Sequence, residues 1–351
     1  MIVAFSFIFS RSPLCYRRYG RLAAANNLAS FVTSGQNLVP TFFSTSTTTN
    51  DRTGTASLTS KPSSSGDQVL TTLSDDGIFV VQMNRPKTLN AWTEPMLREI
   101  ERSFEIASEA SEVKVLILTG GDCQYYCAGV NLSSILKPMH PRKLHGLLRK
   151  KNQRLFDMFL EFNKPTIAAV NGPAIGASVT SAALCDAIVS SETATFSTPF
   201  ARLGLPPEGC SSVHFAQIMG KENAERMIGK EGWIVPAREA YEIGLVHSVV
   251  PPSELMNASF ELAREWIKTG KPRQIGPLKG GPEVLERFKK VNANETIDLA
   301  DSFFSEKFLE GQRLFLSSRG KSFPASMFMI LKLTRPFWKI LLPPEGEGKL
   351  S

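Results

Sequence analysis

The sequence predicts an α/β fold with a mainly parallel sheet. Three observations support this prediction: apolar segments of strand length alternate with helical patterns, the connections between them are short, and the segments end in turns that contain Gly or Pro. A chain of 351 residues can form one large domain or two, and its hydrophobic content of 42% is ordinary for a globular protein.

Ordered structure is predicted to begin near Asp67. Residues 69–73 and 78–83 are strand-like and flank a turn, residues 74–77, that ends in glycine. Together they predict a β-hairpin. Thr93 then precedes a helical pattern as a candidate N-cap, because its hydroxyl can accept a hydrogen bond from the first turn. The apolar face of this helix consists of Met96, Ile100, Phe104 and Ala107.

Strand and helix patterns continue to alternate after this helix. The expected elements, in chain order, are a strand at 113–119, a basic helix at about 141–162, a strand at 166–170, and strands near 187–190 and 194–197. From about residue 252 the pattern is mostly helical, with helices expected at 283–304 and 308–316.

The last apolar segment, residues 327–342, contains three cations and a proline. It is therefore too short and too charged to span a bilayer. Packing against its own or a neighbouring subunit is favoured over lying on a membrane surface. We divide the chain into a transit peptide and disordered linker at 1–66, a core at 67–255, a C-terminal helical region at 256–322 and an apolar, basic tail at 323–351.

The first fifty residues have the composition of a targeting segment. They contain four arginines and no acidic residue, and they are enriched in Ser and Thr. Because the basic residues follow the apolar start instead of preceding it, the segment differs from a secretory signal and predicts a mitochondrial transit peptide. A plastid or peroxisomal address and a merely disordered tail are the alternatives. The ending Lys349-Leu350-Ser351 does not match the peroxisomal Ser-Lys-Leu signal.

Net charge and cysteine usage argue against several classes of function. The formal net charge is +7, and subtracting the four arginines of residues 1–50 leaves +3, which is too weak and scattered to indicate a nucleic-acid partner. The five cysteines show no disulfide framework and no metal-type spacing beyond a loose Cys-x₃-Cys. We therefore expect no metal site and a reducing compartment.

Two loops rich in Gly and Ala follow predicted strands. In residues 127–132 and 171–178 the small side chains let a ligand approach backbone N–H groups. A single carboxylate, Glu208, stands further along in a run of Pro, Gly, Cys and Ser residues. One carboxylate beside two backbone donors can move a proton next to a thioester carbonyl. Ser211 and Ser212 are candidate caps for the helix after Glu208.

Several motifs occur in a fixed order along the chain. They are Asn84-Arg85-Pro86 with Leu89-Asn90-Ala91, Cys127-Ala128-Gly129-x-Asn131-Leu132, Lys164-Pro165-x-Ile167-Ala168-Ala169-Val170-Asn171-Gly172, Ala194-Thr195-Phe196 before Leu203-Gly204, and Ala240-x-Glu242-x-Gly244-Leu245-Val246. Together they resemble the crotonase (enoyl-CoA hydratase/isomerase) superfamily over about residues 68–255, and more loosely over 256–320. The resemblance implies a ββα superhelix core, a C-terminal helical trimerisation region, and a homotrimer or a dimer of trimers.

Two further segments are most similar to the Δ3,Δ2-enoyl-CoA isomerases of this superfamily: Asn171-Gly172-Pro173-Ala174-x-Gly176-x-Ser178-Val179-Thr180 and Pro207-Glu208-Gly209-Cys210-Ser211-Ser212. The resemblance implies an acyl-CoA substrate and no cofactor beyond its CoA. It also implies that the N–H groups of Ala128 and Ala177 form an oxyanion hole and that Glu208 is the acid/base. The residues expected to contact the substrate are Ala128, Gly129, Val130, Asn131, Leu132 and Gly176.

Departures from the superfamily pattern separate its reactions. Hydratases resemble one another in having two glutamates that handle water, and here the corresponding positions are Thr180 and Phe200. Neither side chain can activate water, so hydration is disfavoured. Asn131 stands where the superfamily usually has aspartate. Dienoyl-CoA isomerisation, acyl-CoA hydrolysis, and a non-catalytic acyl-CoA- or RNA-binding role are the alternatives.

Overall fold

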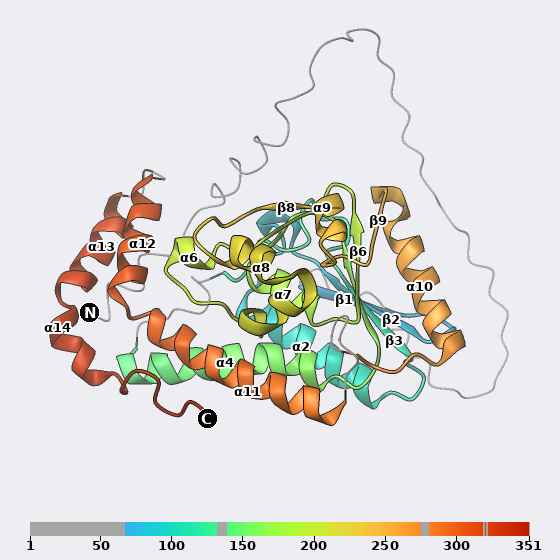
Figure 1. Cartoon of the computed structure of the whole chain (residues 1–351), viewed down its shortest axis with the longest axis horizontal. Coiled ribbons are helices and arrows are strands. Elements are labelled where there is room, and N and C mark those ends of the chain that lie inside the picture. Colours follow the sequence, from blue (N-terminus) through green and yellow to red (C-terminus); the bar gives the residue numbers. More distant parts are fainter. Residues whose placement is uncertain (1–66, 132–138, 275–280, 319, 321, 351) are drawn as a thin grey trace, which may run out of the picture. The chain divides into compact units, whose positions relative to one another are not determined.

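A six-stranded sheet has the strand order β1-β2-β3-β4-β6-β9 (Figure 1). β1 and β2 are antiparallel, with Val69 opposite Met83, which confirms the predicted hairpin. All the other neighbouring pairs are parallel, which confirms the mainly parallel sheet. The strands are β1 (Val69–Leu73), β2 (Ile78–Met83), β3 (Val115–Thr119), β4 (Thr166–Val170), β6 (Ala187–Ser191) and β9 (Ser248–Val250).

The computed structural model describes residues 67–131, 139–274, 281–318, 320 and 322–350. All of them belong to one of the two units into which the chain divides. The predicted transit peptide and linker at 1–66, and the candidate contact residue Leu132, lie outside the described residues.

Helices follow most of the strands. The predicted helix after the hairpin is confirmed as α2 (Glu94–Glu109), and Thr93 caps it by accepting a hydrogen bond from the Met96 N–H at 3.4 Å. The other α-helices of the described residues are α4 (Pro141–Glu161), α5 (Ala177–Ala183), α6 (Phe200–Leu203), α7 (Ser211–Met219), α8 (Lys221–Ile228), α9 (Ala237–Glu242), α10 (Leu255–Thr269), α11 (Pro282–Ser302), α12 (Glu306–Ser318), α13 (Ser322–Leu333) and α14 (Arg335–Trp338). Short 3₁₀ turns lie at Pro86–Thr88, Pro252–Glu254 and Lys339–Leu341.

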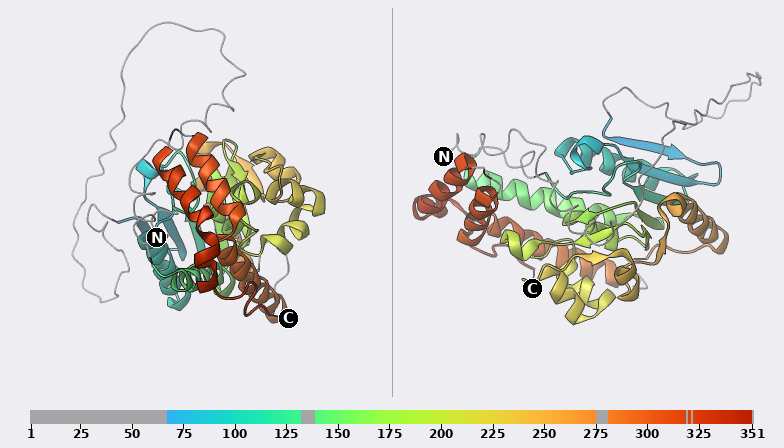
Figure 2. Two further views of the ribbon diagram at one scale, coloured as in Figure 1. Left: turned by 90° about the vertical axis from the view of Figure 1, so that its left-hand side faces the viewer. Right: turned by 90° about the horizontal axis from the view of Figure 1, so that it is seen from above.

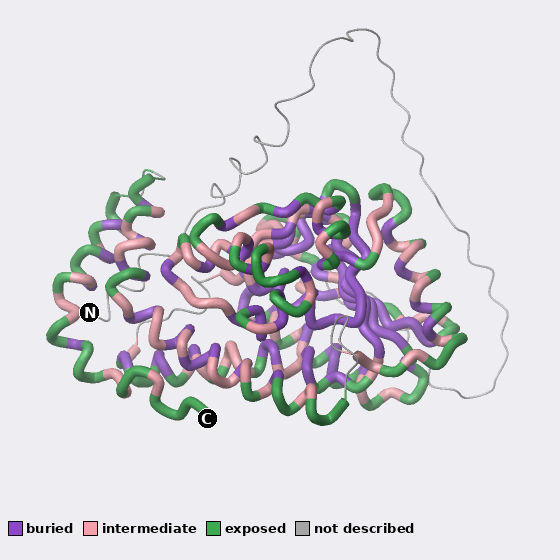
Figure 3. Tube along the Cα trace, in the orientation of Figure 1, coloured by how far each residue is buried: buried purple, intermediate pink, exposed green. Residues whose placement is uncertain are grey.

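Both faces of the sheet are buried, as is typical of parallel strands. In β2, Ile78 and Val80 pack with α10 on one face, whereas Phe79 and Val81 pack with α2 and α4 on the other. This alternation follows from the two-residue period of a strand. Buried residues are correspondingly concentrated along the strands (Figure 3).

A second, three-stranded sheet includes part of the loop after β4. Its strands are β5 (Ala174–Ile175), β7 (Thr195–Ser197) and β8 (Val235–Pro236), in the order β5-β7-β8. β5 is parallel to β7, with Ala174 opposite Phe196. This pairing fixes the backbone directly before α5, where one of the predicted ligand-binding loops ends.

The C-terminal helices pack on the rest of the described chain. α11 lies along α4 (Figure 1), and α12 and α13 lie side by side (Figure 2). Phe328, Leu331 and Trp338 of the tail are buried in a cluster with α12 and the start of α4. Among the described residues, no helix combines the length and the apolar composition needed to cross a bilayer.

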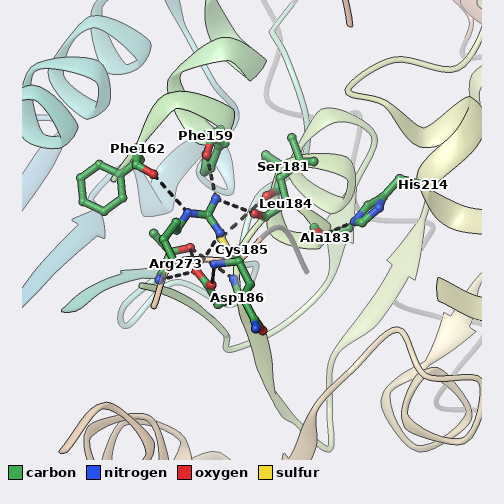
Figure 4. Close-up of polar contacts among 11 residues, drawn as sticks. Phe159, Phe162, Ser181, Ala183, Leu184, Cys185, Asp186, His214 and Arg273 are labelled. Carbon is green, nitrogen blue, oxygen red and sulfur yellow. Dashed lines mark hydrogen bonds and ion pairs between the residues drawn. The ribbon is translucent and has the colours of Figure 1, made fainter. Parts of the chain in front are cut away.

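The segment after α10 is held by a buried ion pair. The Arg273 guanidinium donates to the Asp186 carboxylate at 2.7 Å, and it also donates to the carbonyl oxygens of Phe159, Phe162 and Leu184 (Figure 4). Burial raises the pKa of Asp186, although the Arg273 charge opposes this shift. One side chain thus joins the segment after α10 to α4, α5 and the start of β6.

Candidate active site

The two predicted ligand-binding loops are joined by backbone hydrogen bonds. Cys127 and Ala174 form an isolated parallel bridge, in which the Ile175 N–H donates to the Cys127 carbonyl at 3.0 Å. Ser178 reinforces it, since its hydroxyl donates to the carbonyl oxygens of Cys127 and Ile175. The loop after β3 and the loop after β4 therefore form one backbone unit.

Among its described residues, the first loop leaves one backbone N–H without a partner. The Ala128 N–H donates to the Leu89 carbonyl at 3.0 Å, the Gly129 N–H lies 3.3 Å from the Cys127 sulfur, and the Asn131 N–H donates to the Trp92 carbonyl at 2.8 Å. Within the described part of the chain, Val130 N–H makes no hydrogen bond.

This geometry bears on the prediction that Ala128 is an oxyanion donor, because the Ala128 N–H already donates to the Leu89 carbonyl. In the parallel bridge between Trp92 and Val130, the Gly129 carbonyl and the Asn131 N–H both pair with Trp92. The N–H of Val130 lies on the side away from Trp92. Gly129 is needed for this path, because its φ is +85° and a Cβ there would lie 3.0 Å from the Ile175 carbonyl oxygen. Of these two residues, Val130 therefore has the N–H that is open to a ligand.

The second loop contributes the first N–H of a helix. Ala177 begins α5, so its N–H has no partner within the helix. Gly176 precedes it with φ 64° and ψ −127°, a conformation open to glycine. Gly176 and Ala177 therefore lie where the sequence predicted a turn into a helix start.

Glu208 is a buried carboxylate in the segment between α6 and α7, and only 8% of the residue is exposed. Burial raises its pKa to about 7, the neighbouring Glu295 adds to this increase, and a hydrogen bond from Asn152 opposes it. A carboxylate with this pKa can both accept and return a proton near neutral pH. The His214 Nε2 of α7 contacts the Ala183 carbonyl at 2.9 Å, so the helix after Glu208 packs on the helix that Ala177 begins.

A side-chain relay orients the Glu208 carboxylate. Asn152 Nδ2 of α4 donates to Glu208 Oε2 at 2.6 Å, and Thr296 Oγ1 of α11 donates to Asn152 Oδ1 at 2.7 Å. The sequence analysis missed both residues, because each is one polar position on a long helix.

The helix after Glu208 is capped by a residue that sequence analysis also missed. Glu295 of α11 accepts hydrogen bonds from the N–H groups of Cys210 at 2.6 Å and Ser212 at 2.9 Å. The prediction that Ser211 and Ser212 cap this helix was wrong, because Cys210 is the N-cap and Ser211 Oγ donates to the Glu208 carbonyl.

The other candidate residues have structural roles. Thr180 is buried in α5 and donates to the Ala177 carbonyl, and Phe200 is a buried residue at the start of α6. Burial raises the pKa values of the Cys127 and Cys210 thiols, so both favour the neutral form. Among the described residues no group of three His, Cys, Asp or Glu side chains could hold a metal ion.

The chain belongs to the enoyl-CoA hydratase/isomerase family, whose pattern it matches over residues 74–307. This result confirms the resemblance drawn from the motifs. A solved structure, an enoyl-CoA hydratase/isomerase from Pseudoalteromonas atlantica T6c, superposes with a TM-score of 0.60 at 23% identity, covering 72% of this chain and 98% of that one. This similarity confirms the crotonase-like fold.

Relatives with different activities resemble this chain. It is 34% identical to human enoyl-CoA delta isomerase 2 over 268 residues, or 74% of this chain and 66% of the relative. It therefore spans just under two thirds of that relative's length. It is 32% identical to mouse peroxisomal enoyl-CoA delta isomerase 3 (71% of this chain, 78% of the relative), and 34% identical to a short-chain-enoyl-CoA hydratase of Clostridium acetobutylicum (66% and 85%).

Proposed function

We propose that the protein isomerises 3-cis- and 3-trans-enoyl-CoA to 2-trans-enoyl-CoA in fatty-acid β-oxidation. The observation that supports this most is the environment of Glu208: a single buried carboxylate with a pKa of about 7, oriented by Asn152. Two relatives are named enoyl-CoA delta isomerases, which agrees with the proposal.

In the proposed mechanism the thioester oxygen accepts hydrogen bonds from the N–H groups of Val130 and Ala177. Ionised Glu208 removes a proton from C2, and the electron pair moves onto the thioester oxygen to form a dienolate. Glu208 then returns the proton to C4 while the double bond forms between C2 and C3. The two donors stabilise the negative charge as it develops, and the loss of one such donor typically costs about 3 kcal/mol.

Among the described residues, no second carboxylate stands at the positions expected to handle water. Hydration in this family would need a pair of glutamates, and Thr180 and Phe200 occupy those positions. Glu295 is the other buried carboxylate near Glu208, but its two oxygens already accept the N–H groups of Cys210 and Ser212. Isomerisation by one carboxylate is therefore favoured over the hydratase reaction for which the Clostridium relative is named.

We also make proposals about the cofactor, the assembly and the location of the enzyme. We propose that CoA enters only as part of the substrate, that no other cofactor is needed, and that the C-terminal helices assemble a homotrimer or a dimer of trimers. A mitochondrial location follows from the composition of residues 1–50. A relative described as peroxisomal makes that compartment the main alternative.

Purified protein supplied with 3-cis- and 3-trans-enoyl-CoA should form 2-trans-enoyl-CoA, which can be followed by its absorbance and by chromatography. Parallel reactions with 2-trans-enoyl-CoA, a dienoyl-CoA and a saturated acyl-CoA test hydration, dienoyl isomerisation and hydrolysis. A folded protein that leaves both 3-enoyl substrates unchanged would refute the proposal. Faster hydration than isomerisation would assign it to the hydratases.

Asn152→Ala should lower kcat by roughly tenfold, because the carboxylate loses a hydrogen bond to its charged form. That bond lowers the Glu208 pKa, so its removal should also move the acidic limb of the kcat/KM profile to higher pH.

Gln153→Ala is the matched control for Asn152→Ala, because the backbone carbonyl of Gln153, which accepts from Asn292, is unchanged by the substitution. Thr296→Val should have a smaller effect than Asn152→Ala and should add little to it, since both act through one relay. Additive losses in the double variant would contradict the relay.

A further inference from the structure

The turn that carries Glu208 has an unfavourable backbone conformation. Gly209 and Cys210 both have φ values of 65°, and Cys210 is one of three described non-glycine residues with positive φ. Such residues persist only where surrounding contacts hold them. Gly209 is itself confined, because a Cβ there would lie 2.4 Å from the Phe156 ring.

The contacts that hold this turn come mainly from α11. Glu295 accepts the N–H groups on the two sides of Ser211, those of Cys210 and Ser212. The Cys210 thiol donates to the Phe288 carbonyl of the same helix at 3.3 Å. Cys210 makes no side-chain cap bond for α7, so the Glu295 carboxylate takes the place that a capping side chain usually fills.

Two consecutive residues of α11 thus act on Glu208 by different routes. Glu295 holds the backbone that follows it, and Thr296 orients Asn152, which holds its carboxylate. Only 6% of Glu295 is exposed, and this burial raises its pKa, whereas the hydrogen bonds from Ser212 and Cys210 oppose the increase.

We propose that Glu295 is a positioning residue for the reaction: its carboxylate fixes the turn that presents Glu208. This inference rests on the proposed function of Glu208 as the base. It assigns to α11 a part in catalysis without contact with the substrate.

The charged and titratable groups around this pair are few among the described residues. Asp298 of α11 lies near Glu295, and Asp157 of α4 lies near Cys210; both add negative charge. Lys349 pairs with Asp298 at 2.5 Å. Asn292, from α11, donates to Asp157 at 2.8 Å. Glu295 is the carboxylate among these groups that raises the pKa of Glu208.

Glu295→Gln in the full-length protein should lower kcat by roughly tenfold, since an amide cannot accept both N–H groups with equal geometry. It should also move the acidic limb of the kcat/KM profile to lower pH, because the negative charge beside Glu208 is lost. A residue with a merely structural role would lower stability or kcat without this shift. Glu286→Gln, which removes an exposed carboxylate from the same helix, should leave both quantities unchanged.

Glu295→Asp separates the two effects. Aspartate keeps the negative charge, but its shorter side chain places the carboxylate farther from the N–H groups of Cys210 and Ser212. We therefore expect kcat to fall while the acidic limb of the kcat/KM profile stays near its wild-type pH. If Glu295→Gln does not fold, this variant decides alone: wild-type kcat in Glu295→Asp would overturn the positioning role.

The side-chain carboxyl ¹³C shift of Glu208, assigned by its loss in Glu208→Gln, gives a readout that does not need turnover. A lower titration midpoint of Glu208 in Glu295→Gln than in the wild type supports the inference, whether or not the wild type turns over 3-enoyl-CoA. If the wild type is inactive on 3-enoyl-CoA, only the proposed function fails. An unchanged midpoint together with unchanged kcat in a folded Glu295→Gln protein would overturn the inference.

Discussion

Glu208→Gln is expected to lower turnover of 3-enoyl-CoA by about 10²–10⁴-fold, the usual contribution of a positioned acid/base group. Glutamine keeps the shape and can still accept the Asn152 N–H, but it cannot take a proton from C2. Steady-state assays at pH 8 would measure the loss, and calorimetry with a saturated acyl-CoA should show unchanged binding. In the wild type, kcat/KM should fall as the pH drops below about 7, where Glu208 becomes protonated.

Glu192→Gln, at an exposed position, is a suitable control because it removes one carboxylate far from any proposed role. It should retain wild-type turnover. Wild-type turnover in Glu208→Gln would mean that another group is the base.

Glu208→Gln should also stabilise the protein at alkaline pH. Burial raises the Glu208 pKa from 4.5 to about 7, so its contribution to stability is full below about 4.5 and is lost as the pH rises through 7. Each pKa unit between the two values corresponds to about 1.36 kcal/mol. Between pH 4.5 and pH 8 the free energy of unfolding of the wild type should therefore fall by about 3 kcal/mol relative to that of Glu208→Gln. Urea unfolding at both pH values would measure this difference.

Arg273→Met is expected to lower the free energy of unfolding by about 3–5 kcal/mol, because it leaves the Asp186 carboxylate buried without its cation. The side chain of Asp186 has no exposed surface, and that of Arg273 is 12% exposed. Three carbonyl oxygens on Phe159, Phe162 and Leu184 would also lose their donor. Denaturant unfolding monitored by circular dichroism would give the change.

Arg264→Met provides the comparison for this ion pair. Arg264 also donates to a carboxylate at 2.7 Å, that of Asp76, but both side chains are well exposed. Loss of the Arg264–Asp76 ion pair should change the free energy of unfolding by about 0–1 kcal/mol. A similar small change in Arg273→Met would show that the buried network contributes little.

Much of the fold could be predicted because local pattern and position agree. The hairpin, the Thr93 cap and the buried strands are each determined by residues close in sequence, through turn chemistry, capping and apolar runs. The two turns in the predicted ligand-binding loops have the same local origin, since Gly129 and Gly176 mark backbone conformations that other residues disfavour.

The support of Glu208 could not be predicted, because it depends on long-range contacts. Asn152 is 56 residues away from Glu208, and Glu295 is 85 residues away from Cys210. Neither position differs in sequence from an ordinary polar residue on a helix. The choice between Ala128 and Val130 has a related origin: a motif identifies a loop, whereas the bridge from Trp92 decides which N–H remains free.

The dependence of Glu208 on α11 also limits how the chain can be divided. A fragment that ends before Pro282 would keep the sheet, both backbone loops and Glu208 itself. It would lack Glu295 and Thr296, and so the turn and the relay would both lose their anchors. If Glu208 is the base as proposed, the smallest catalytic unit is larger than the core predicted at 67–255, and a truncated or recombined protein that binds acyl-CoA is expected to be inactive.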